Sequence, residues 1–225
     1  MANDTLPFLA FPGEIRNRIY TLLLVVPPPS TTTAFGEKAH IYPKILQVNK
    51  QIHHEALPFL YSKNTFIAHP VRLYRFPQLR RWMDPVKAPH LIALIRRYHV
   101  FVRLECDAGF SPEAARDAFS GIEELTVEMF RSQFKGSRNG VLRLFEGVTG
   151  VGRARVFGSI DGWTKYGAWL QDHMMTDEGR EQVEIWRTIS INDLDKFCSQ
   201  VESGAGGGMM NRREHETTCS VYTNV

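Results

Sequence analysis

The chain is poor in cysteine, with three among 225 residues. Cys106, Cys198 and Cys219 lie far apart, so they lack the close spacing of a zinc site and leave one thiol over in any pairing. A framework of several disulfides is therefore excluded, and this cysteine usage is typical of a reducing compartment. The sequence predicts an intracellular protein, cytoplasmic, nuclear or both.

Long apolar runs and a strong excess of one charge are also absent. No run approaches the roughly 20 apolar residues of a membrane-spanning helix. The first residues carry no basic region, and Pro7 and Pro12 interrupt their short apolar stretch, so we expect no signal peptide. The formal net charge of +3 favours neither nucleic acid nor membrane. We therefore expect no membrane association.

Motifs for catalysis and for metal binding are missing too. His53 and His54 are adjacent, and adjacent side chains on a helix point in different directions. Gly147, Gly150 and Gly152 follow an expected helix and precede an expected strand, the reverse order of a phosphate-binding loop. The sequence therefore predicts a non-enzymatic protein with no catalytic residue, no metal site and no cofactor.

Two apolar-periodic segments lie near the N-terminus. The first predicts a helix over 12–26, with Pro12 in its first turn and prolines 27–29 ending it. Its apolar face consists of Ile15, Ile19, Leu22, Leu23 and Val26. The second predicts a helix over 45–60, with an exposed Pro58 and an apolar face of Ile45, Val48, Ile52, Ala56, Phe59 and Leu60. We expect the two faces to pack against each other.

The two segments, FPGEIRNRIYTLLL and ILQVNKQIHHEALPFLYSKNTF, resemble the two conserved blocks of fungal F-box-like proteins. The positions that match the first block are Pro12, Glu14, Ile15, Arg16, Asn17, Ile19 and Tyr20. Those that match the second are Leu46, Val48, Gln51, Ile52, Glu55, Ala56, Leu60, Tyr61, Asn64, Thr65 and Phe66. The resemblance implies an F-box-like helical module.

A true F-box docks its first helix on a Skp-type adaptor of a cullin ubiquitin ligase, and the rest of the chain recruits a target. The resemblance thus implies protein partners, with adaptor contacts at Phe11, Pro12, Ile15, Ile19 and Leu23. An alternative stays open, in which the same apolar faces pack only against the protein's own core. In that case the chain is a stand-alone structural or regulatory binding protein.

Strand and helix patterns alternate after residue 64. A short strand over 64–68 precedes a basic segment, 70–86, which we expect to be helical in two pieces split at Pro77, with Leu79, Trp82 and Met83 facing inward. Further strands are expected at 97–105, 124–129 and 154–158, and helices at 111–119, 141–145 and 163–174. This alternation predicts an α/β fold with parallel strands, and α+β is the alternative.

The strand-to-strand spacing is about 27 residues, from Val100 to Val127 and on to Val156. This spacing resembles a degenerate leucine-rich-like repeat, and a compact α/β layer is the alternative. The predicted organisation is an F-box-like module at 6–68, an α/β recognition region at 69–202 and a disordered tail at 203–225. Residues 27–40 are expected to form a mobile loop.

A basic cluster with interleaved aromatic residues gives a less favoured third reading. It consists of Arg72, Arg75, Arg80, Arg81, Arg96 and Arg97, with Tyr74, Trp82 and Tyr98 between them. Arginine and aromatic side chains can contact phosphates and bases of nucleic acid. The leading hypothesis remains a protein-interaction module that recruits a substrate to a ubiquitin ligase, and weak nucleic-acid binding through 72–97 is an alternative.

Overall fold

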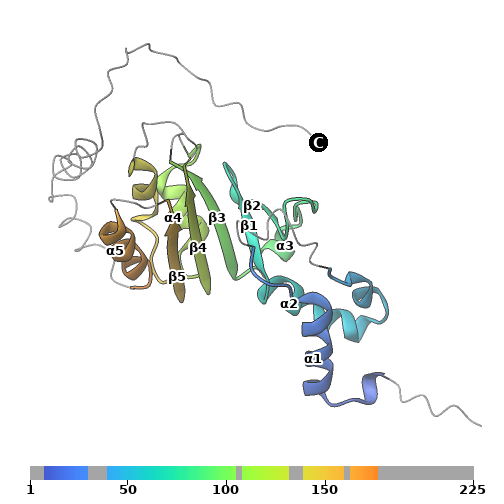
Figure 1. Cartoon of the computed structure of the whole chain (residues 1–225). Coiled ribbons are helices and arrows are strands. Elements are labelled where there is room, and N and C mark those ends of the chain that lie inside the picture. The colour runs from blue at the N-terminus through green and yellow to red at the C-terminus, as the bar shows by residue number, and fades with distance from the viewer. Residues whose placement is uncertain (1–7, 30–39, 105–107, 132–138, 160–162, 177–225) are drawn as a thin grey trace, which may run out of the picture.

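The computed structural model describes residues 8–29, 40–104, 108–131, 139–159 and 163–176, and they contain one five-stranded sheet (Figure 1). Its strands, β1 Thr65–His69, β2 Leu73–Gln78, β3 Arg97–Arg103, β4 Glu124–Phe130 and β5 Arg153–Gly158, lie in the order β2-β1-β3-β4-β5. β1, β3, β4 and β5 are parallel, and β2 is antiparallel to β1. The fold class is α/β, as the alternation of strands and helices predicts.

The helices precede the sheet, connect its strands or, in the case of α5, follow its last strand. They are η1 Phe8–Ala10, α1 Gly13–Leu24, η2 Pro43–Gln47, α2 Lys50–Ser62, α3 Pro89–Ile92, α4 Pro112–Phe119, η3 Asn139–Phe145 and α5 Thr164–Met174. The α1–α2 pair lies beyond the β2–β1 side of the sheet, far from α5 (Figure 1). Across the described ranges, no helix combines the length and the apolar character needed to cross a membrane.

The predicted repeat spacing is visible in the strand register. Val100 pairs with Val127, and Val127 pairs with Val156. These valines lie on the face of the sheet that α4, η3 and α5 cover, where Tyr98 meets Phe119 of α4 at 5.6 Å between ring centroids. On β5, Arg155 and Phe157 point to the other face and are exposed, because side chains alternate along a strand. The helices therefore cover one face of the parallel strands.

The helical prediction for 70–86 is wrong. Leu73–Gln78 forms β2, an edge strand that turns back on β1 directly after Pro70. A proline is compatible with an edge strand, because the outer side of that strand needs no N–H donor, and the Pro77 carbonyl accepts the N–H of Val86. Leu79 is buried as expected, whereas Trp82 is half exposed.

The predicted apolar faces of the first two helices are only partly correct. The side chains of α1 that enter the core are Tyr20 and Leu24, whereas Ile15 and Leu22 are exposed. In the second segment, Ile52, Ala56 and Leu60 are buried, and Val48 is exposed because it precedes α2. Asn49 begins α2 as its N-cap and accepts the N–H of Gln51 at 2.7 Å, which separates α2 from η2.

Several sequence predictions fall outside the described residues. These concern most of the loop at 27–40, the part of the 69–202 region that follows residue 176, and the tail at 203–225. The three cysteines also lie outside the described residues. The domain boundaries stay predictions, and β1, which the boundary at 68 would cut, pairs with both β2 and β3.

Candidate interaction surfaces

A charged cluster joins α1 to α2. Arg16 contacts both carboxylate oxygens of Glu55, with Nε–Oε2 and Nη2–Oε1 distances of 2.9 Å each. The Tyr20 hydroxyl and the side-chain amide of Gln51 each donate a hydrogen bond of 2.9 Å to the same carboxylate. Arg16 also donates to the Phe11 carbonyl at 2.6 Å. A two-pronged guanidinium–carboxylate contact fixes orientation as well as distance, so this cluster sets the angle between the helices.

These contacts lower the pKa of the Glu55 carboxyl group to about 2, chiefly through the hydrogen bonds from Arg16 and Gln51. The unfolded chain therefore binds more protons than the folded one between about pH 4.5 and pH 2, and stability rises with pH across that window. The stabilisation is fully present above the window and is lost as the pH falls through it.

We therefore expect Glu55→Gln to lower stability at neutral pH and to approach wild-type stability as the pH falls from about 4.5 towards 2. Urea unfolding followed by circular dichroism over this pH range measures the difference. A difference between the two proteins that is constant across the window would contradict the assignment of the low pKa to Glu55.

Asn64 joins the C-terminal ends of α1 and α2 through hydrogen bonds. It is fully buried. Its amide donates to the carbonyls of Leu24 at 2.7 Å and Leu60 at 2.9 Å, and its carbonyl accepts the N–H of Val26 at 2.9 Å. Polar residues that carry the resemblance to F-box-like proteins, among them Arg16, Tyr20 and Glu55, thus hold the helix pair together and are not free for a partner.

The residues expected to contact an adaptor lie along α1 and just before it. Phe11 is half-buried and meets Phe8 edge to face, and Pro12 is exposed at the N-cap. Ile15 is 40% exposed, Ile19 is half-buried, and Leu23 is half-buried and packs against the core. Of this set, Pro12 and Ile15 are therefore exposed to solvent, whereas Leu23 packs against the core.

Leu22 of α1 is also apolar and exposed, and it is not among the adaptor contacts that the resemblance implies. It is 81% exposed, and with Ile15 and Ile19 it follows the i, i+4, i+7 spacing of one helix face. The periodicity of the sequence placed Leu22 on the apolar face of the predicted helix. It did not show that this face is exposed to solvent. We call Ile15, Ile19 and Leu22 the α1 stripe.

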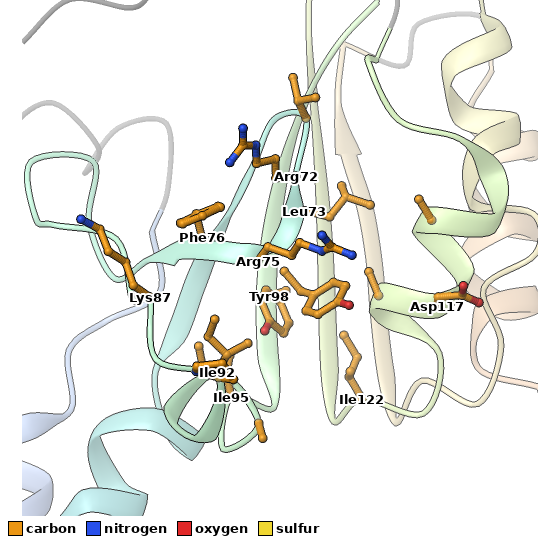
Figure 2. Close-up of a pocket in the computed structure, with 16 residues that line it drawn as sticks. Arg72, Leu73, Arg75, Phe76, Lys87, Ile92, Ile95, Tyr98, Asp117 and Ile122 are labelled. Carbon is orange, nitrogen blue, oxygen red and sulfur yellow. The ribbon is translucent and has the colours of Figure 1, made fainter.

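A groove of about 1160 Å³ is the second surface, and it lies between β2, α3 and α4 (Figure 2). Its apolar lining includes Leu73, Ile92, Ile95, Tyr98 and Ile122. Its charged lining consists of Arg72, Arg75, Lys87 and Asp117. Sequence reasoning missed this β2–α4 groove, because it treated the β2 segment as helical.

The arginine cluster at 72–97 is divided by the fold. Arg80 is buried and donates to the carbonyls of Leu79 and Pro27. Arg81 lies 4.4 Å from the ring centroid of Phe101, on the face of the sheet opposite α4, η3 and α5, and Arg97 pairs with Glu123 at 2.5 Å. Of the cluster, Arg72 and Arg75 line the groove, so the fold does not bring all six arginines to one surface.

A buried histidine–glutamate pair lies on the face of the sheet opposite α4, η3 and α5. His99 Nε2 and Glu128 Oε2 are 2.9 Å apart, both side chains are almost fully buried, and Phe101 stacks on His99. Burial and the nearby Arg81 lower the pKa of His99 to about 4, against a hydrogen bond to the Pro29 backbone. Neither residue lines the groove. In the part of the chain that the structure describes, no three His, Cys, Asp or Glu side chains converge as metal ligands.

The chain matches no protein-family model, and neither the curated proteins nor the solved structures include a significant match to it. Function is therefore argued from the geometry of the α1 stripe and the β2–α4 groove, together with the resemblance of the two N-terminal segments to fungal F-box-like proteins.

Proposed function

We propose that this chain is a non-enzymatic, F-box-like interaction protein, which docks a Skp-type adaptor through α1 and recruits a target to a cullin-type ubiquitin ligase. The observation that carries the proposal is that α1 has two apolar faces. One face, with Tyr20 and Leu24, is fully buried against the core, and the other is the solvent-facing α1 stripe.

An exposed stripe of large apolar side chains favours a partner helix or groove. One helix face is enough to hold α1 in place, because Tyr20 and Leu24 are fully buried and Arg16 is paired with Glu55. Leaving Ile15 and Leu22 in water gains nothing for the fold, since apolar surface stabilises a protein only where water is removed from it. Helices with anchors at i, i+4 and i+7 are a recurring mode of protein recognition.

The test is retention of the full chain on an immobilised Skp-type adaptor. We expect wild type to be retained, and Leu22→Asp and Ile15→Asp to lose at least about tenfold in affinity for the adaptor. Binding would remove water from the new carboxylate and bury it against an apolar surface, which costs free energy. Both side chains are exposed, so the variants are expected to fold.

Thr21→Asp is the matched control, because it places the same charge on the same helix at an exposed position away from the stripe. It should be retained like wild type. Failure to retain wild type, or equal retention of Leu22→Asp, would overturn adaptor docking, as would an equal loss in Thr21→Asp.

A second candidate is a stand-alone binding protein that uses no adaptor. The observation that favours it is the β2–α4 groove, which includes no residue of α1. A chain that binds a partner in the groove and ignores the adaptor would have this second function.

A further inference from the structure

The β2–α4 groove exists because the helix layer does not cover the whole sheet. α4, η3 and α5 cover β3, β4 and β5, whereas the connection from β2 to β3 contains only the four-residue helix α3. Figure 2 shows Tyr98 of β3 between Arg75 on β2, Ile95 after α3 and Ile122 after α4. A longer helix after β2 would fill this space.

The groove joins an apolar floor to a cationic rim. Leu73, Ile95 and Tyr98 are buried in its lining. Arg72, Arg75 and Lys87 carry its positive charge, and among the described residues they form no salt bridge. The single acid, Asp117, is 3.4 Å from Arg116. The lining therefore carries three positive charges and one negative charge, and that negative charge is shared with a neighbouring arginine.

This combination restricts the chemistry of a ligand. A purely apolar ligand would remove water from the rim cations without replacing it, which costs free energy. A basic ligand would be repelled. An acidic ligand with apolar side chains satisfies both parts, because arginine binds a carboxylate through two parallel hydrogen bonds while the floor takes the apolar groups.

The open form of the groove favours a peptide over a small metabolite. Sites for small molecules usually bury most of the surface of the ligand, whereas this groove of about 1160 Å³ is open to solvent. Leu73, in the lining of the groove, has a left-handed backbone conformation with φ at 49°. This conformation is rare for a bulky residue and costs stability, and such strained residues cluster at functional sites.

We propose that the β2–α4 groove binds an acidic, apolar peptide segment of a partner protein. Carboxylates of the segment pair with the cationic side chains of the lining, Arg72, Arg75 and Lys87, and its apolar side chains contact Leu73 and Tyr98. The proposal rests on the proposed function in one respect, since it makes this groove the place where the target is recruited.

The experiment is selection of short random peptides, displayed on phage, against the immobilised full chain. The Arg72→Glu/Arg75→Glu double variant serves for counter-selection, and both arginines are exposed, so it is expected to fold. Enriched peptides should combine Asp or Glu with large apolar residues. The best synthetic peptide should bind wild type at least about tenfold more tightly than the double variant, as measured by fluorescence anisotropy.

A double variant of two exposed arginines elsewhere, Arg18→Glu/Arg155→Glu, has the same change of net charge and should bind the peptide like wild type. The proposal is overturned if nothing is enriched, if the enriched peptides lack acids, or if both double variants bind equally. It is also overturned if single-stranded RNA displaces the peptide and loses affinity in the Arg72→Glu/Arg75→Glu variant, since the groove would then be an RNA site.

The two proposals fail separately. Leu22→Asp should bind the selected peptide like wild type, and Arg72→Glu/Arg75→Glu should be retained on the adaptor like wild type. Adaptor retention without peptide binding would overturn the groove proposal alone, and peptide binding without adaptor retention would overturn only adaptor docking.

Discussion

Replacing Asn64 by alanine is expected to lower the free energy of unfolding by about 3 kcal/mol, since each buried polar group left without its partner costs roughly 1–3 kcal/mol. The substitution removes partners from the Val26 N–H and from the Leu24 and Leu60 carbonyls at once. Asn64 is 0% exposed, so water cannot replace the lost hydrogen bonds without opening the structure. Urea unfolding followed by circular dichroism measures the loss.

Asn49→Ala provides the matched comparison, because it removes an asparagine of the same region whose hydrogen bond is exposed. Loss of an N-cap is expected to cost only about 1 kcal/mol. If Asn64→Ala costs no more than Asn49→Ala, then Asn64 does not join the ends of α1 and α2 in the way the structure indicates.

Gly158→Ala is expected to lower the free energy of unfolding by roughly 3 kcal/mol, the upper range for a strained backbone position. Gly158 has φ at +109°, and a Cβ atom there would lie 2.0 Å from the carbonyl oxygen of Met129. That carbonyl accepts the N–H of Ser159 at 2.9 Å, so moving it away would break a hydrogen bond at the end of β5.

Gly13→Ala is the control for Gly158→Ala. Nothing lies within 4 Å of a Cβ atom at Gly13, which is the first residue of α1. Alanine favours a helix over glycine by up to about 1 kcal/mol, so this variant should be as stable as wild type or slightly more stable. Equal thermal stability of the two alanine variants would contradict a steric requirement for glycine at 158.

The sequence predicted the elements whose patterns are local. Alternation and spacing located β3, β4 and β5, and the spacing between Val100, Val127 and Val156 matches their register in the sheet. Helical periodicity likewise located α1 and α2. These patterns arise from neighbours along the chain, so the sequence contains them directly.

The orientation of α1 was not predictable from the sequence, because it depends on residues about 40 positions away. Tyr20 is polar at its tip, and its burial is favourable because Glu55 accepts its hydroxyl hydrogen. A periodicity argument gives the ring no such partner and instead assigns Ile15 and Leu22 to the core. Periodicity therefore identified the stripe as apolar. Only the resemblance implied that Ile15 and Ile19 are accessible, and it did not include Leu22.

The groove was hidden for a related reason. Leu79, Trp82 and Met83 have the i, i+3, i+4 spacing of a helix face, and the prediction extended that helix back over the β2 segment. The pairing of Ile67 with Gln78 shows that this segment is a strand. The groove exists because α3, with four residues, leaves part of the sheet uncovered. Which part stays uncovered depends on the order of the strands in the assembled sheet.

The order of the parallel strands also bears on how the protein acquires its structure. Paired positions are 32 residues apart between Thr65 and Arg97, 27 between Arg97 and Glu124, and 29 between Glu124 and Arg153. The entropy cost of closing a loop grows only slowly with length, so the three closures cost nearly the same. Loop closure by itself therefore favours no one adjacent pair of parallel strands as the place where the sheet starts to fold.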